Sequence, residues 1–541
     1  MAAVKRDSAR VFIDATVSEL KPLAVASALA EWEASTTGEP AAQREAAKCE
    51  TELRLFLASR DRHERTVESL ESNPGADPLT RRQLRLLYLD QVENQLPRET
   101  IEDLVRRAKN IQAEFYTFRA ELDGRPVTNN AILDVLREER KTPRRRAAWE
   151  ASKGIGPRVA GPLLELVERR NEAARSLGYR DYYAMRLELQ EIDEDELFRV
   201  FGELKDRTDR PFRDAKRDID DRLAQRFEIT PEELRPWHYD DPFFQEPPLV
   251  DELGLGPKFE GRDLLKIARD FFANVGLPID DVLARSDLYE RDGKDQHAYC
   301  TNIDREGDVR ILCNLKDDER WMGILLHELG HAAFEKGFPP SLPWLLRQPA
   351  HIATTEAVAM FMDRLIFDAG WLQRAAGISL EHPDQLQRDA FRALRFEMLL
   401  MARWVLVMTT FERDLYADPR QPDLDDHWWD LVETLQLLPR PEGRQAPDWA
   451  AKIHLTAAPV YYHNYLLGEL IASQLGAAIE RRALAGRAAD GYVDCPELGG
   501  FLRERWFAPG ASIHWQELLE SATGSPLTPE PFLNDFVAGE I

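Results

Sequence analysis

The chain has 541 residues, 43% of them hydrophobic and 31% charged, which is the composition of a globular protein with a sizeable core. Its formal net charge of −25 would repel nucleic acid, so we expect no nucleic-acid partner. No run of about eighteen apolar residues occurs, and the N-terminal segment is charged where a signal peptide would be apolar, so we expect no membrane partner and a cytoplasmic location.

Long amphipathic helices are predicted over the first two thirds of the chain. Apolar residues recur every three or four positions in residues 101–122 and again in residues 195–227, which is the period of a helix with one buried face. Five prolines in residues 236–257 exclude a continuous helix there and favour a long ordered loop. The periodicity therefore predicts a mainly α fold.

The helical pattern is interrupted once, in residues 287–315. Residues 287–289, 297–303 and 309–315 have the composition of strands, and residues 304–307 supply turn chemistry between the last two. A small antiparallel sheet is therefore predicted directly before the next helix.

That next helix, predicted over residues 321–334, carries the residues that point most directly to chemistry. His327 and His331 are four residues apart, so both imidazoles project from one helical face and can hold one Zn²⁺ ion. Glu328 follows the first histidine and can reach a water molecule beside the metal without binding the metal itself. We therefore predict a zinc site at His327 and His331, with Glu328 as the general base.

A third ligand is needed so that one position of a tetrahedral zinc ion stays open. Glu356 is the only acidic residue in the apolar segment 350–361, for which Thr354 or Thr355 is the predicted N-cap of a helix. We predict Glu356 as the ligand, and His351, which precedes the helix, as the alternative.

With Glu356 placed 25 residues after His331, the chain resembles the gluzincin peptidases. More narrowly it resembles the angiotensin-converting enzyme family of peptidyl-dipeptidases, and next the thimet oligopeptidase family. The likeness is strongest over residues 297–361 and 452–470, with a weaker similarity over residues 171–183.

The resemblance implies a two-lobed, mainly helical fold with a deep central channel and the small sheet beside the metal site. We accordingly expect a helical lobe over residues 1–285 and a catalytic lobe over residues 286–541, together forming a single structural unit.

The resemblance also implies a substrate-binding edge strand just before the zinc helix, at His297, Ala298 and Tyr299. An extended peptide would add to this edge as a further strand, and His297 would donate a hydrogen bond to the substrate carbonyl beside the cut.

A second segment completes the site that the resemblance implies. His454 and Tyr465 would donate hydrogen bonds to the oxyanion, while Lys452 and Tyr462 would hold the C-terminal carboxylate of the substrate. The gap from His454 to the tyrosines is one residue longer than in the converting enzymes, so Tyr461 competes with Tyr462 for this position.

The chain departs from the converting enzymes at two further positions. Asn464 stands where they use a chloride-binding arginine, and Met360 stands where they have an aspartate that supports the metal ligands.

These features predict a zinc metallopeptidase that acts on short peptides and releases C-terminal dipeptides. The alternatives are an oligoendopeptidase of the thimet oligopeptidase type and an inactive peptide-binding homologue. Glu328 is intact, which argues against the inactive homologue.

Overall fold

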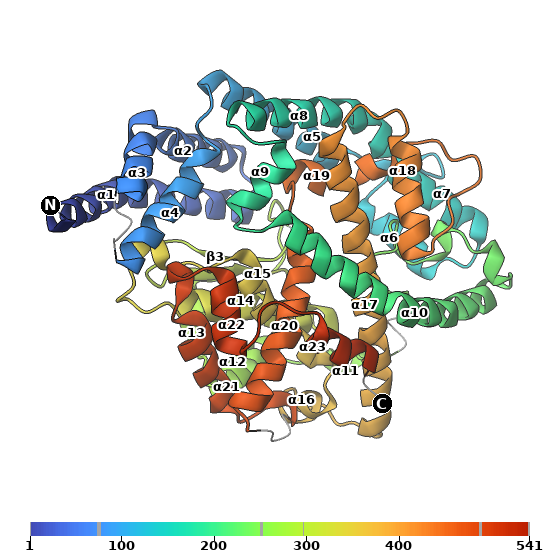
Figure 1. Cartoon of the computed structure of the whole chain (residues 1–541). Coiled ribbons are helices and arrows are strands. Elements are labelled where there is room, and N and C mark those ends of the chain that lie inside the picture. Colours follow the sequence, from blue (N-terminus) through green and yellow to red (C-terminus); the bar gives the residue numbers. More distant parts are fainter. Residues whose placement is uncertain (1, 73–76, 249–252, 296, 486–489, 539–541) are drawn as a thin grey trace. The chain divides into compact units, whose positions relative to one another are not determined.

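The computed structural model describes the whole chain except residues 1, 73–76, 249–252, 296, 486–489 and 539–541 (Figure 1). It contains two compact units, each assembled from three separate stretches of the chain. The first unit comprises residues 1–95, 253–390 and 467–532, and the second comprises residues 96–252, 391–466 and 533–541. The lobe boundary near residue 285 and the deep channel stay predictions.

The first unit holds four N-terminal helices, a two-stranded sheet and the helices that follow it. Its elements are α1 (Ala2–Thr37), α2 (Pro40–Leu57), α3 (Arg60–Ser72), α4 (Pro78–Val92), α11 (Gly256–Phe259), α12 (Leu264–Asn274), α13 (Asp280–Arg285), β3 (Tyr299–Asn302), β4 (Val309–Leu312), α14 (Glu319–Lys336), α15 (Ile352–Asp363), α16 (Ala369–Arg374), α21 (Pro496–Phe501), α22 (Trp515–Thr523) and the start of α23 (Glu530–Leu533).

The second unit is helical apart from one short hairpin. Its elements are α5 (Arg98–Thr117), β1 (Ala120–Leu122), β2 (Arg125–Val127), α6 (Asn129–Glu138), α7 (Thr142–Ser152), α8 (Gly156–Ser176), α9 (Tyr182–Leu189), α10 (Glu194–Phe227), α18 (Leu424–Leu431) and α19 (His454–Ala457). Three of the described helices have residues in both units: α17 (Pro383–Ala417), α20 (His463–Arg482) and α23.

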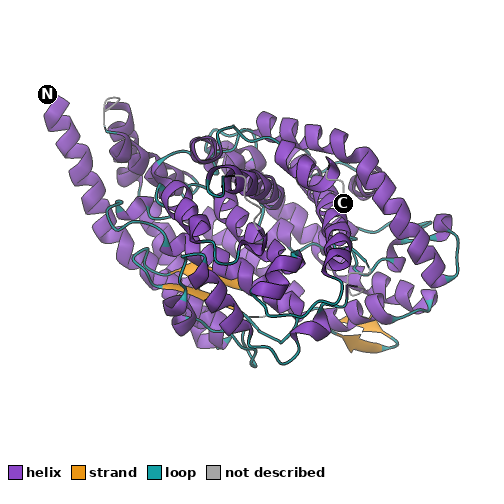
Figure 2. Ribbon diagram, turned by 90° about the horizontal axis from the view of Figure 1, so that it is seen from below, coloured by secondary structure: helices purple, strands orange, loops and turns teal. Residues whose placement is uncertain are grey.

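The mainly α fold predicted from the sequence is confirmed, since the described strands form only two small antiparallel pairs among many helices (Figure 2). The helix predicted over residues 195–227 is present as α10, and residues 236–248 form the predicted loop apart from one 3-10 turn. Residues 249–252 of that loop lie outside the described part of the chain. None of the described helices is both long and apolar enough to cross a bilayer.

The helix predicted over residues 101–122 is wrong at its end. Helix α5 stops at Thr117, and residues 120–122 form strand β1 instead. The cause is the Asp123–Gly124 pair, whose backbone takes φ values of 53° and 71°. Both values are positive, as the tight turn that closes the β1–β2 hairpin requires.

The predicted sheet before the zinc helix is present but shorter than expected. Strands β3 and β4 pair antiparallel, with Tyr299 opposite Leu312, so His297 and Ala298 lie just before β3. The far side of β4 is covered by the segment at Asp287, whose N–H donates to the Ile311 carbonyl at 3.1 Å. Among the described residues no strand pairs with the outer side of β3, so β3 is the open edge of the sheet.

Candidate active site

Helix α14 brings the two predicted histidine ligands together. Asp318 caps the helix by accepting a hydrogen bond from the Trp321 N–H at 2.8 Å, and apolar residues bury most of the helix surface. The four-residue spacing places the ring centroids of His327 and His331 4.9 Å apart, with their Nε2 atoms separated by 3.3 Å.

Helix α15 supplies the third candidate ligand because it packs closely on α14. Gly330 makes this approach possible, since a Cβ atom there would lie 2.8 Å from the Cα atom of Ala359. The Oε2 atom of Glu356 consequently lies 3.7 Å from the Nε2 atom of each histidine.

The separations among these three donors fit one zinc ion. Tetrahedral bonds of about 2.0–2.1 Å place neighbouring ligand atoms roughly 3.3–3.5 Å apart. The observed separations of 3.3 and 3.7 Å are close to these values, and the three ligand atoms lie within 4.8 Å of one another. Three protein ligands leave one tetrahedral position for water or substrate.

The start of α15 differs from the prediction. His351 is the N-cap, and its Nδ1 atom accepts a hydrogen bond from the Ala353 N–H at 3.1 Å. Thr354 and Thr355, the predicted caps, lie inside the helix, and the Thr354 hydroxyl donates to the carbonyl of His351 at 2.6 Å. The Oγ1 atom of Thr355 instead lies 2.7 Å from Nδ1 of His331 and orients that ring.

Asp363 is a functional candidate that the sequence analysis missed. Its Oδ2 atom lies 2.8 Å from Nδ1 of His327, which makes it the carboxylate partner of this ring. Met360, at the position where the converting enzymes have an aspartate, is buried beside Gly468. The available signal was spacing, because a residue seven positions after Glu356 returns to the same helical face.

The surroundings of the two histidines shift their pKa values in opposite directions. Burial disfavours the charged form of His327, but the hydrogen bond and charge of Asp363 prevail and raise its pKa to about 10. Burial, aided by the neighbouring positive charge of His327, holds the pKa of His331 far below its usual range. Burial also raises the pKa of Glu328 to about 7, although the charge of His327 opposes this shift.

The predicted substrate-binding edge lies at the end of an anchored loop. The side chain of His297 is 92% exposed, and its backbone N–H donates to Oδ1 of Asp295 at 3.0 Å. The carboxylate of Asp295 also contacts the imidazole at 3.3 Å, and this hydrogen bond raises the pKa of His297. Ala298 and Tyr299 are half-buried and lead directly into β3.

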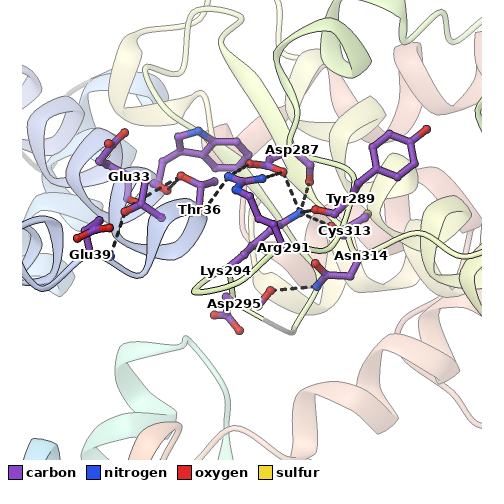
Figure 3. Close-up of polar contacts among 12 residues, drawn as sticks. Glu33, Thr36, Glu39, Asp287, Tyr289, Arg291, Lys294, Asp295, Cys313 and Asn314 are labelled. Carbon is purple, nitrogen blue, oxygen red and sulfur yellow. Dashed lines mark hydrogen bonds and ion pairs between the residues drawn. The ribbon is translucent and has the colours of Figure 1, made fainter.

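Lys294, three residues before His297, is held by several polar contacts (Figure 3). Its side chain is fully buried, and Nζ donates to the backbone carbonyls of Asp287, Tyr289 and Cys313 as well as to the Asp287 carboxylate. Asn314 holds the Asp295 carbonyl at 3.0 Å in the same view. These contacts hold Lys294 and Asp295, which precede β3 in the chain.

The second predicted group of residues is brought together in the other unit. His454 opens α19, Tyr461 and Tyr462 lie in the turn before α20, and Tyr465 lies in its first turn. The ring of Tyr462 has centroid distances of 4.8 Å to His454 and 5.5 Å to Tyr465, while Tyr461 is 5.3 Å from Tyr465. Tyr462 is buried and lies outside α20, whereas Tyr465 lies within it, so the turn before α20 determines how the two rings meet.

Lys452 lies near the ring of Tyr462, which also contacts His454 and Tyr465. Its Nζ atom donates to Oε1 of Gln245 at 2.6 Å and lies 5.8 Å from the ring centroid of Tyr462. Burial lowers the pKa of Lys452 to about 8, although Asp241 and Glu246 oppose the shift. Gln245 was not predicted, because nothing in its local sequence distinguishes it from other residues of the proline-rich loop.

Helix α20 connects these residues along the chain to the region of the candidate metal ligands. Tyr465 precedes Gly468 by less than one helical turn, and a Cβ atom on Gly468 would lie 3.0 Å from the Cβ atom of Glu356. Glycine at this position therefore allows α20 to approach α15 at the third candidate ligand.

Two histidines and a glutamate on packed helices, with a second glutamate between the histidines, are the arrangement of a gluzincin metallopeptidase. The comparisons with known families agree: the model of peptidase family M3 matches residues 283–538, and the model of angiotensin-converting enzyme matches residues 3–206. The resemblance to gluzincin peptidases is therefore confirmed, and the matches support a metallopeptidase acting on peptides. No individual curated protein matches the chain.

Proposed function

We propose that the chain is a zinc-dependent peptidyl-dipeptidase that removes dipeptides from the C-terminus of short peptides. The donor set of His327, His331 and Glu356 supports the zinc dependence. Lys452 supports the exopeptidase part of the proposal: it is a buried cation hydrogen-bonded to the neutral Gln245, and the charges of Asp241 and Glu246 offset the effect of burial on its pKa only in part. A substrate carboxylate at this point would supply a countercharge and fix the register of the peptide.

The proposed chemistry divides between the metal and Glu328. Zn²⁺ held by the three ligands supplies Lewis acidity, which polarises a carbonyl and lowers the pKa of water. Glu328 takes the proton of the attacking water and delivers it to the leaving amine. Burial raises the pKa of Glu328 to about 7, which suits a group that both accepts and returns a proton near neutral pH.

His454 and Tyr465 are proposed to stabilise the oxyanion by donating hydrogen bonds. Two observations support these roles. Both side chains contact the ring of Tyr462, and Tyr465 lies on α20, the helix that packs against Glu356 through Gly468. Tyr462, with Lys452, is proposed to bind the substrate carboxylate. Tyr461, which contacts Tyr465, remains the alternative.

The substrate backbone is proposed to pair with the open edge at His297, Ala298 and Tyr299. The support is the strand order, in which β4 lies between the Asp287 segment and β3, so that β3 has its outer side available for a peptide. This mode suits extended, flexible peptides, whose backbone N–H and C=O groups are free to pair with the edge.

Substitution of Glu328 tests the proposed chemistry. Glu328→Gln keeps the shape of the side chain but cannot accept a proton, so we expect full zinc content and a loss of kcat of about 100-fold or more. Glu356→Ala should lose zinc itself. Retained activity in Glu328→Gln would contradict the mechanism, and full zinc content in Glu356→Ala would place the third ligand elsewhere, with His351 next.

An oligoendopeptidase is the second candidate, because the match to peptidase family M3 covers all of the proposed metal and substrate residues. Peptides with free and amidated C-termini distinguish the two activities. We expect amidation to lower kcat/KM about tenfold or more, as the loss of a hydrogen bond to a charged group implies. Equal cleavage of both peptides would favour the oligoendopeptidase.

A further inference from the structure

Val460, directly before the two tyrosines, has an unusual backbone conformation. Its φ is 55°, in the left-handed region, and its side chain is 1% exposed. A β-branched residue rarely adopts this conformation, because its Cβ atom crowds the following carbonyl. Such strain persists only where surrounding contacts hold it, and it is found most often at functional sites.

Two side-chain hydrogen bonds, one buried and one partly buried, hold the N–H and the carbonyl of Val460. Its N–H donates to Oε1 of Glu412 on α17 at 2.9 Å. Its carbonyl accepts from Nε2 of Gln190, the residue that ends α9, at 3.1 Å. Gln190 also accepts a hydrogen bond from Nδ2 of Asn464 at 3.0 Å, which ties the same side chain to the first turn of α20.

The segment before Val460 is fixed as well. The guanidinium of Arg170 donates to the carbonyls of Leu455 and Thr456 at 3.0 and 2.8 Å, and it contacts the hydroxyl of Tyr416 at 3.0 Å. The end of α19, which begins with His454, is therefore held from α8. Between α19 and α20 the direction of the chain depends on the strained residue.

We propose that Glu412 and Gln190 are positioning residues, which hold Val460 in the left-handed conformation and thereby place Tyr461, Tyr462 and Tyr465 for the reaction. The inference rests on the proposed function. If Val460 relaxed to a negative φ, the chain after it would turn in another direction, and Tyr462 would lose its 4.8 Å ring contact with His454. Displacing a group that acts in the transition state by about 1 Å can cost about 100-fold in rate.

Three variants separate positioning from simple stability. Glu412→Ala removes the acceptor and should lower kcat about 10- to 100-fold while zinc content stays unchanged. Glu412→Gln keeps an oxygen that accepts the Val460 N–H, so its kcat should stay within about threefold of the original. Gln190→Ala removes the hydrogen bond to the Val460 carbonyl and should also lower kcat. It tests the same proposal if Glu412→Ala does not fold.

Relieving the strain supplies the decisive comparison. Glycine adopts a positive φ freely, so adding Val460→Gly to Glu412→Ala should recover at least about fivefold of the lost kcat. Val460→Ala is the matched control, because it also removes both methyl groups but keeps the Cβ atom that opposes the left-handed conformation. Equal recovery by alanine and glycine, or an unchanged kcat in Glu412→Ala, would overturn the proposal.

Amide hydrogen exchange over residues 458–465 makes the test independent of the reaction. Exchange in this segment should be faster in Glu412→Ala than in Glu412→Gln, and Val460→Gly should partly restore protection in Glu412→Ala. If the unmodified protein cleaved no peptide, the proposed function would fail while the exchange data still decided whether the contacts hold the turn. Identical exchange in all variants would overturn the positioning role.

Discussion

At the scale of single residues, Asp363 is the carboxylate partner of His327, one of the candidate metal ligands. Its contact with Nδ1 fixes the tautomer in which Nε2 carries the free lone pair. We expect Asp363→Ala to weaken zinc affinity about 10- to 100-fold, measured by competition with a chelator. Asp384→Asn, at an exposed position in the first turn of α17, is the control and should bind zinc as the original does. Unchanged affinity in Asp363→Ala would show that Asp363 does not support the metal.

Lys452 predicts a particular pH dependence. Because burial lowers its pKa to about 8, Lys452 is charged below that pH and loses its charge as the pH rises through it. The kcat/KM for a peptide with a free C-terminus should therefore fall above about pH 8, while that for the amidated peptide should not follow it. The ratio of the two should be independent of pH in Lys452→Met. A ratio that stays constant to pH 10 in the unmodified enzyme would contradict the carboxylate site.

Spacing alone identified the residues that lie together on one helix. His327, Glu328 and His331 share one helix, so their spacing alone predicts a joint site. Asp363 and Gln245 were not predicted, because the residues that they contact, His327 and Lys452, lie 36 and 207 positions away in the chain. The strained backbone of Val460 could not be predicted either, because it is held by Glu412 and Gln190, which are distant from it in the sequence.

At the scale of elements, the contact between α14 and α15 determines whether the ligands meet. Gly330→Ala would place a Cβ atom 2.8 Å from the Cα atom of Ala359, so the two backbones would have to move apart. We expect loss of zinc and a melting temperature lower by several degrees, as about 1–3 kcal/mol of overpacking implies. The matched control is Gly202→Ala on α10, where a Cβ atom meets nothing within 4 Å and the melting temperature should hold or rise. Full zinc content in Gly330→Ala would contradict this account.

Elements were predictable where one period ran without interruption. Helix α10 follows its apolar pattern from Glu194 to Phe227, even through Pro211. The error in α5 arose because a helical period continued into residues 118–122, where the Asp123–Gly124 turn and pairing with β2 prevailed. The start of α15 was misplaced because a histidine side chain took the capping role usually filled by serine or threonine.

At the scale of the whole molecule, each compact unit draws on three stretches of the chain. Hydrophobic periodicity describes one helix at a time, so it predicted the fold class but not which stretches pack together. The family matches likewise cover separate parts of the chain, one over residues 3–206 and the other over residues 283–538. The donor set was still predictable, because all of its members lie on two successive helices of one unit.

The net charge of −25 predicts how salt affects the activity. An acidic protein attracts cationic peptides, and salt screens this attraction, with a Debye length of about 10 Å at 0.1 M. Raising the salt concentration from about 20 to 200 mM should therefore lower kcat/KM for a peptide carrying two lysines several-fold, and change it little for a neutral peptide. The effect should depend on ionic strength alone.

Chloride should consequently act like any other anion. Asn464, at the position where the converting enzymes bind chloride through arginine, is a buried neutral amide, and its Nδ2 atom already donates to Gln190 at 3.0 Å. Without a cation at that position, an anion would gain too little to offset its loss of hydration. We expect potassium chloride and potassium acetate to give superimposable activities at equal ionic strength, with zinc content checked in both. Substituting Asn464 by aspartate, which would repel an anion, should leave the chloride response unchanged. A specific activation by chloride of more than about threefold would show that the protein binds the anion through residues other than Asn464.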